Sequence, residues 1–138
     1  MKIYALDSNI ISAMLKENQA IINRYEQEVE QGKAFIIPPI VLYEIQRGLL
    51  VKNMLKRLRN FENFCENIEI GEFNIQVWLK AAEIYAELSK QGKPVGTPYD
   101  GDVFIAAFCI INGYTLITSN KDHFERIDGL NFENWSLI

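Results

Sequence analysis

The chain has 138 residues, of which 49% are hydrophobic, and its formal net charge is −4 at pH 7. This length and composition suffice to bury a core without disulfides or structural zinc, so we expect a single domain spanning residues 1–138. The negative charge argues against a protein that holds DNA or membranes by bulk positive charge, because that mode of binding needs many lysines and arginines.

The expected secondary structure alternates between strands and helices. Short apolar runs that stop at polar residues or prolines predict strands over residues 2–6, 34–37, 68–70, 115–118 and 130–132. Longer segments predict helices over residues 40–51, 53–65, 74–91 and 103–111, and another that Asn18 caps and Gly32 ends. This alternation predicts an α/β fold, a three-layer α/β/α sandwich with a mainly parallel central sheet.

The segment 74–91 shows the clearest helical pattern. Asn74 is expected to cap this helix, and Phe73 and Trp78 occupy the two positions of a hydrophobic staple. The residues expected to line its apolar face are Trp78, Ala81, Ala82, Tyr85 and Leu88.

The two cysteines, Cys65 and Cys109, form no CxxC pair, and each stands in an apolar stretch expected to be helical. We therefore expect buried, reduced thiols. The segment before Asp7 is too short and too polar for a signal peptide, and no apolar run approaches the roughly 18 residues of a membrane span. These features predict a cytoplasmic protein that does not bind a membrane.

Acidic or amide side chains follow, precede or interrupt four of the apolar runs. They are Asp7, Glu44, the pair Asp100 and Asp102, and the pair Asn120 and Asp122. Sites in parallel sheets lie at the carboxyl ends of strands, which is where Asp7 and residues 118–122 are expected. Carboxylates gathered in one cleft raise each other's pKa unless a cation neutralises them. Convergence of these side chains would therefore predict a hard divalent metal with oxygen ligands.

Each acid also has a structural explanation. Asp7 could cap a following helix, and either Asp100 or Asp102 could cap the helix after them. Glu44 could form an ion pair with Arg47, three residues further on. Taken together, the four clusters favour a site over four separate structural roles.

The single histidine, His123, disfavours metal-free RNA cleavage by a histidine pair. As a lone ring in a polar turn it is expected at the surface. The chain has no phosphate-binding glycine loop and no zinc-ligand spacing. The carboxylates are therefore expected to carry the chemistry.

Five basic residues fall within thirteen positions, with no acid between Glu44 and Glu62. They are Arg47, Lys52, Lys56, Arg57 and Arg59. They could form a track for an RNA backbone beside an acidic metal site, although a solvated helix face is the simpler explanation.

The order of these pieces resembles PIN domains, and within them the VapC-type toxins of bacterial toxin–antitoxin pairs. The resemblance rests on Leu6-Asp7-Ser8-Asn9, on Tyr43-Glu44-Ile45 with Gly48, on Asp102-Val103-Phe104-Ile105-Ala106-Ala107, on Leu116-Ile117-Thr118-Ser119-Asn120, on Phe124-Glu125-Arg126-Ile127 and on residues 129–135. It implies that Asp7, Glu44 and Asp102 form an acidic metal-binding core, and that Thr118 and Asn9 orient the first carboxylate. The extra acid Asp100 departs from the pattern.

The resemblance also implies an activity. By this resemblance the protein would be a ribonuclease that requires Mg²⁺ or Mn²⁺. It would cut single-stranded or loop RNA, such as tRNA or rRNA, and leave a 5′-phosphate and a 3′-hydroxyl. Asn120 stands where many relatives have a fourth aspartate. Either Asn120 ligates through its carbonyl oxygen or a water, or Asp122 substitutes, or a second ion binds weakly.

Similar toxins are homodimers inhibited by a small antitoxin. The antitoxin wraps the helical pair after the second strand, here residues 40–65, and directs a basic side chain toward the acids. Leu49, Leu50 and Met54 could form the groove for it or could belong to the core.

Two other functions remain open from the sequence. One is a PIN-like RNA- or protein-binding module that is catalytically weak because Asn120 replaces an acid. The other is a phospho-acceptor signalling domain that uses Thr118 and Lys121.

Overall fold

The structure, a computed structural model, describes residues 2–92 and 100–135. Its centre is a five-stranded sheet in the order β3-β2-β1-β4-β5, and every neighbouring pair of strands is parallel. The strands are β1 (Ile3–Leu6), β2 (Ala34–Ile37), β3 (Glu69–Ile70), β4 (Thr115–Thr118) and β5 (Phe132–Asn134). The predicted parallel α/β arrangement is confirmed.

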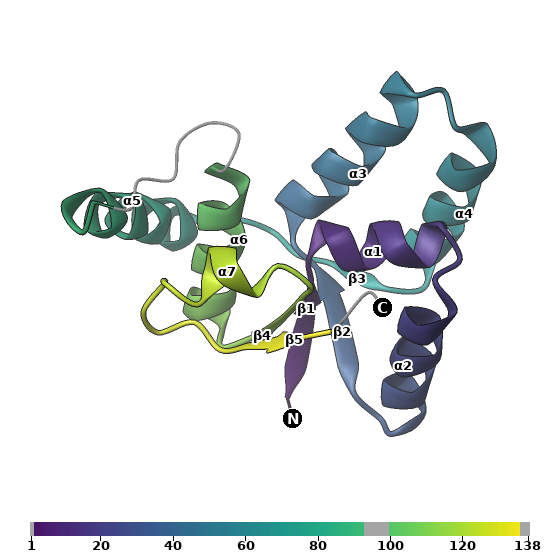
Figure 1. The fold of residues 1–138 in the computed structure, drawn as a ribbon, viewed down its shortest axis with the longest axis horizontal. Helices are drawn as coiled ribbons and strands as arrows, with labels where there is room; N and C mark the ends of the chain where they lie inside the picture. Colours follow the sequence, from purple (N-terminus) through teal and green to yellow (C-terminus); the bar gives the residue numbers. More distant parts are fainter. Residues whose placement is uncertain (1, 93–99, 136–138) are drawn as a thin grey trace.

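Helices cover the sheet on both faces. Helices α5 and α6 lie to one side of the strands in Figure 1, and α1 to α4 lie to the other. The helices are α1 (Ser8–Leu15), α2 (Gln19–Glu30), α3 (Pro39–Val51), α4 (Leu55–Glu66), α5 (Ile75–Lys90), α6 (Asp100–Asn112) and α7 (Lys121–Phe124). Parallel strands covered in this way lose contact with water, which is why β1 and β4 consist almost wholly of buried residues.

Pairing between β1 and β4 places the ends of both strands side by side. Leu6 is in register with Ile117, and the backbone N–H of Asp7 donates to the carbonyl oxygen of Ile117 at 2.9 Å. Because this hydrogen bond continues the ladder beyond β1, Asp7 lies next to Thr118 at the end of β4.

Two helices were not predicted, and the last strand lies two residues further along than expected. Helix α1 begins directly after Asp7, whose side chain accepts a hydrogen bond from the Ser8 N–H, so this aspartate is also a helix cap. Helix α7 is a single turn and too short to show a periodic pattern. The last strand is 132–134 rather than 130–132.

The prediction for the buried face of α5 was partly wrong. Its buried residues are Val77, Ala81, Ile84 and Leu88. Trp78 is 51% exposed and Tyr85 is 42% exposed. The predicted staple is present, because the rings of Phe73 and Trp78 lie 5.6 Å apart. Apolar residues occupy two adjacent stripes of this helix, and periodicity alone does not tell which stripe meets the core.

Both cysteines are free thiols, and Cys109 is fully buried while Cys65 is half-buried. Burial raises the pKa of both thiols. No helix within residues 2–92 and 100–135 is long and apolar enough to cross a bilayer.

Candidate active site

Three carboxylates from three different elements lie near one another beyond the carboxyl ends of the central strands. Asp7 follows β1, Glu44 lies in α3, and Asp102 lies in the first turn of α6. Burial, with a smaller contribution from the charge of Asp102, raises the pKa of Asp7 to about 6. Burial, followed by the charges of Asp7 and Asp102, raises the pKa of Glu44 to about 7. The fold therefore gathers the three acids that the sequence singled out.

A hydrogen-bond network fixes the Asp7 carboxylate. The Ser8 N–H donates to Oδ1 at 2.8 Å, and the Thr118 hydroxyl donates to Oδ2 at 2.7 Å. The Asn9 amide also donates to Oδ2, at 3.2 Å, and its carbonyl oxygen accepts from the Ser119 N–H at 3.2 Å. Thr118 and Asn9 thus orient the carboxylate as predicted, because both ends of it are held by donors.

Asp102 is held by a residue that the sequence placed at the surface. Nδ1 of His123, on α7, lies 2.7 Å from Oδ2 of Asp102, and the Asn120 amide nitrogen lies 2.8 Å from the same ring nitrogen. Burial raises the pKa of Asp102, and the contact with His123 opposes that rise. The expectation that His123 is a solvent-facing side chain was wrong, since α7 turns its ring back toward α6.

Glu44 is the least satisfied of the three acids. Its Oε1 atom is buried and has no hydrogen-bond partner among the described residues. Oε2 packs against the backbone of Gly101, where a Cβ atom would stand only 2.8 Å away. The alternative of an ion pair with Arg47 is wrong, because the Arg47 guanidinium lies over the Tyr43 ring at 5.0 Å.

Two of the predicted acids stay outside this network. Asp100 is exposed and lines an apolar hollow between α5 and α6 together with Trp78 and Phe104. Asp122 is exposed in the first turn of α7. Metal binding by Asp100, Asn120 or Asp122 therefore stays a prediction without support from these contacts.

Comparison with known proteins decides the family. The sequence matches the PIN domain family over residues 4–130. The chain belongs to the PIN-domain family. This membership removes the phospho-acceptor alternative.

Relatives of this PIN domain cover nearly its whole length. It is 33% identical over 134 residues to the tRNA(fMet)-specific endonuclease VapC of Shigella flexneri, with 96% of this chain and 98% of that protein aligned. It is 32% identical over 137 residues to Ribonuclease VapC2 of Rickettsia felis, with the same coverage.

Solved structures agree with these relatives. VapBC2 from Rickettsia felis bound to a promoter DNA fragment matches with a TM-score of 0.87 at 29% identity, covering 97% of this chain and 99% of that one. DNA-bound VapBC from Salmonella typhimurium matches with a TM-score of 0.83 at 29% identity, covering 98% and 99%.

The acids of this PIN domain fit a hydrated divalent ion. The unpartnered Oε1 of Glu44 and the raised pKa values of Asp7, Glu44 and Asp102 are what close carboxylates show without a cation between them. Within the described residues, no three acidic, histidine or cysteine side chains stand close enough to hold one ion. Mg²⁺ takes one or two carboxylates and keeps several waters, so this spacing suits it.

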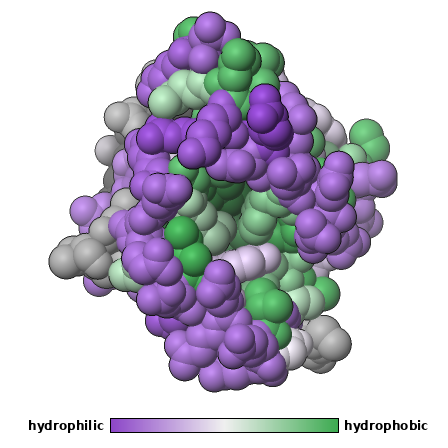
Figure 2. Space-filling view, turned by 90° about the vertical axis from the view of Figure 1, so that its right-hand side faces the viewer, coloured by the Kyte–Doolittle hydropathy of each residue, from purple (hydrophilic) through white to green (hydrophobic). Residues whose placement is uncertain are grey.

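A groove between α1, α3 and α4 reaches this site. Figure 2 shows the side of the PIN domain that carries α1 to α4, and this side has a hollow with a hydrophobic floor inside a hydrophilic rim. The groove is lined by Ser12, Leu15, Lys16, Glu44, Ile45, Gly48, Leu49, Lys52, Met54 and Arg57. Of the three residues for which a groove and the core were both open, Leu49 lines the groove and also belongs to the core, Met54 lines the groove, and Leu50 is 58% exposed outside it.

Two of the five predicted basic residues face this groove. Lys52 and Arg57 line it together with Lys16, a third cation that the sequence analysis did not single out because it lies in another segment. The other three do not line it: Lys56 and Arg59 are exposed on α4, and the Arg47 guanidinium lies over the Tyr43 ring. The predicted basic track is therefore a three-residue rim at the groove rather than one continuous helix face.

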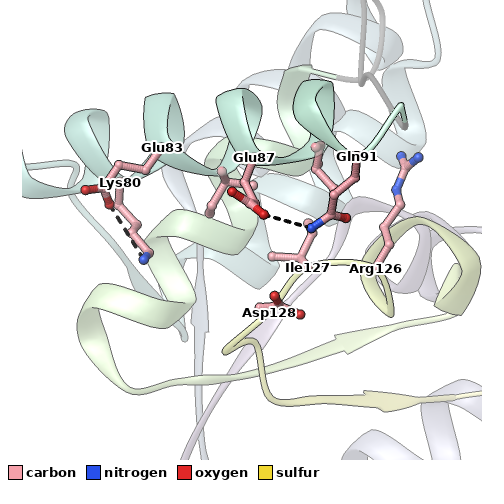
Figure 3. Close-up of a pocket in the computed structure, with 9 residues that line it drawn as sticks. Lys80, Glu83, Glu87, Gln91, Arg126, Ile127 and Asp128 are labelled. Carbon is pink, nitrogen blue, oxygen red and sulfur yellow. Dashed lines mark hydrogen bonds and ion pairs between the residues drawn. The ribbon is translucent and has the colours of Figure 1, made fainter.

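A second hollow, of about 290 Å³, lies between α5 and residues 126–128 (Figure 3). Its polar side chains pair with one another: Lys80 lies 3.6 Å from Glu83, and Gln91 donates to Glu87 at 3.0 Å. Arg126, which borders it, donates to the backbone oxygen of His123 at 3.2 Å. This hollow therefore lies between α5 and the segment that follows His123.

Proposed function

We propose that this PIN domain is an endoribonuclease that hydrolyses phosphodiesters of single-stranded or loop RNA with hydrated Mg²⁺ or Mn²⁺, which one or two of the acids Asp7, Glu44 and Asp102 would bind directly and the others through water. The observation that carries the proposal is the gathering of three carboxylates with raised pKa values, two of them raised in part by the neighbouring acids, around an unpartnered buried oxygen of Glu44. The VapC relatives, which are named as ribonucleases, support it. Such an enzyme would act in the cytoplasm, where its substrate is.

Each acid has a distinct part in the proposed reaction. When bound, a divalent ion lowers the pKa of water and offsets negative charge on the phosphate. Asp7, fixed by Ser8 and Thr118, would be a rigid ligand. Glu44, with a pKa of about 7 and a free Oε1, would accept the proton of the attacking water.

A protein partner is part of the proposal. The groove that ends at Glu44 has an apolar floor and a basic rim, so it fits an antitoxin segment with apolar and acidic side chains. A similar solved structure, from Klebsiella pneumoniae, is described as a toxin–antitoxin complex, and the VapBC structures of Rickettsia felis and Salmonella typhimurium are bound to DNA. We also propose a homodimer, which would bury the exposed apolar residues of α5, namely Ile75, Trp78, Leu79 and Tyr85.

Cleavage of end-labelled RNA with Mn²⁺, compared with DNA and with an EDTA control, tests the activity. We expect the protein to cut RNA only with metal, and Asp7→Asn to lower the rate about 100-fold or more. Asp128→Asn, which removes an exposed carboxylate, should cut at the original rate. A folded protein that leaves RNA intact with Mn²⁺, or an Asp7→Asn variant as active as its parent, would contradict the proposal and favour a non-catalytic binding module.

A further inference from the structure

The segment from Thr118 to His123 contacts two of the three acids. We infer that His123 is a positioning residue, which holds the Asp102 carboxylate in a fixed place beside Asp7 so that both can bind one ion. This inference rests on the proposed function and extends it to a residue outside the acidic core.

A continuous set of contacts connects the two carboxylates. The Thr118 hydroxyl donates to Asp7 at 2.7 Å, and the backbone N–H of Asn120 donates to that hydroxyl at 2.9 Å. The backbone N–H of His123 donates to the backbone oxygen of Asn120 at 3.2 Å, and Nδ1 of His123 lies 2.7 Å from Asp102. Asp7 and Asp102 belong to different elements, so this short segment is what ties their positions together.

The ring of His123 is itself anchored. Phe124, the next residue, is fully buried, and Arg126 donates to the His123 backbone oxygen at 3.2 Å. An ionised carboxylate can only accept hydrogen bonds, so the pairing with Asp102 uses the proton on Nδ1. With Nδ1 protonated, the Asn120 amide nitrogen beside it does not donate to it. Because the backbone of His123 is anchored, its N–H restricts the rotamers of the Asp102 side chain. A mobile donor such as an exposed lysine or a water would not restrict them.

A plain structural role makes a different prediction. The His123 and Asp102 side chains are 31% and 20% exposed. The structural alternative is that their pairing fastens α7 to α6 and does nothing more. In that case its loss would change stability and leave ion affinity unaltered. Groups that orient a metal ligand behave otherwise, because their removal typically weakens ion binding by about 10- to 100-fold.

Two substitutions of similar size separate these cases. In His123→Asn the amide places an N–H at the position of Nδ1, whereas His123→Leu fills the same space without a donor. Mn²⁺ binding is measured by the paramagnetic resonance signal of free Mn²⁺ during titration, below the unfolding midpoint of each variant. We expect the leucine variant to bind Mn²⁺ about tenfold more weakly and the asparagine variant to stay within about threefold of the parent.

His123→Gln serves as a second polar variant, because its amide lies one bond further out and should fail to restore binding. RNA cleavage by the leucine variant should show a lower kcat with an unchanged KM, since Asp102 does not select the RNA. Equal Mn²⁺ affinity in the parent and all variants, or equal weakening by asparagine and leucine, overturns the inference alone. A parent protein that binds no Mn²⁺ overturns the proposed function as well.

Discussion

Replacing Asp7 with asparagine should make the metal-free protein more stable at alkaline pH, although it removes a proposed ligand. Asp7 is 3% exposed, and its pKa is raised from 3.8 to about 6 in the folded protein. By linkage, this shift corresponds to about 3 kcal/mol of folding free energy. The Ser8 N–H and the Thr118 hydroxyl would then donate to an amide in place of a carboxylate, and we expect the weaker hydrogen bonds to cost about 1 kcal/mol of folding free energy. The expected net gain is about 2 kcal/mol at pH 8.

The sign follows from which state binds the proton more tightly. The folded pKa of Asp7 lies above the unfolded value, so the protein loses stability as pH rises between about 4 and 6. Asparagine has no charge to bury at any pH and escapes this loss. The advantage of the variant should therefore disappear near pH 4, where the aspartate is protonated in the folded state.

Urea unfolding with EDTA at pH 8 and at about pH 4 measures both quantities, and Asp128→Asn provides an exposed control that should change stability by less than about 0.5 kcal/mol. An Asp7→Asn variant that is less stable than its parent at pH 8 would refute the reasoning. So would a gain of the same size at both pH values, because it would not come from the buried charge.

Three glycines give further predictions. Gly101→Ala would place a Cβ atom 2.8 Å from Oε2 of Glu44. We therefore expect the rate of RNA cleavage to fall by about tenfold or more, with little change in stability toward urea. An unchanged rate would show that Glu44 moves freely. Gly71→Ala would place a Cβ atom 2.3 Å from the Phe108 ring and should cost about 1–3 kcal/mol in urea unfolding. Gly48→Ala meets no atom within 4 Å in a helix and should stabilise by up to about 1 kcal/mol; equal effects at positions 71 and 48 would contradict the packing argument.

The strands that carry the site were predictable because their signal is local. Residues 34–37 and 115–118 are short apolar runs that stop at polar residues or prolines, and the structure has these same bounds. The residues alone marked four clusters, at Asp7, at Glu44, at Asp100 with Asp102 and at Asn120 with Asp122; the choice of Asp7, Glu44 and Asp102 among them came from the resemblance to PIN domains. Asp7 stands at such a strand end, whereas Glu44 and Asp102 reach the same edge from helices α3 and α6, whose placement the sequence does not fix.

The contribution of His123 could not be predicted, for a physical reason. Its helix is one turn long, so the direction of the ring depends on how Phe124 docks into the core and not on any periodic pattern. The exposed stripe of α5 was misjudged for a related reason, since Trp78 is as apolar as a core residue. Which apolar side chains meet the core is decided by tertiary packing.

The hydrogen bond between Thr118 and Asp7 joins residues 111 positions apart. During synthesis, a nascent chain that displays Asp7 and Glu44 but not yet β4 has no hydroxyl to hold the first carboxylate and no imidazole for Asp102. The contacts that hold Asp7 and Asp102 can therefore form only after residues 118–123 have been made. If the proposed nuclease activity is present, a chain that ends before β4 lacks part of the support of its site.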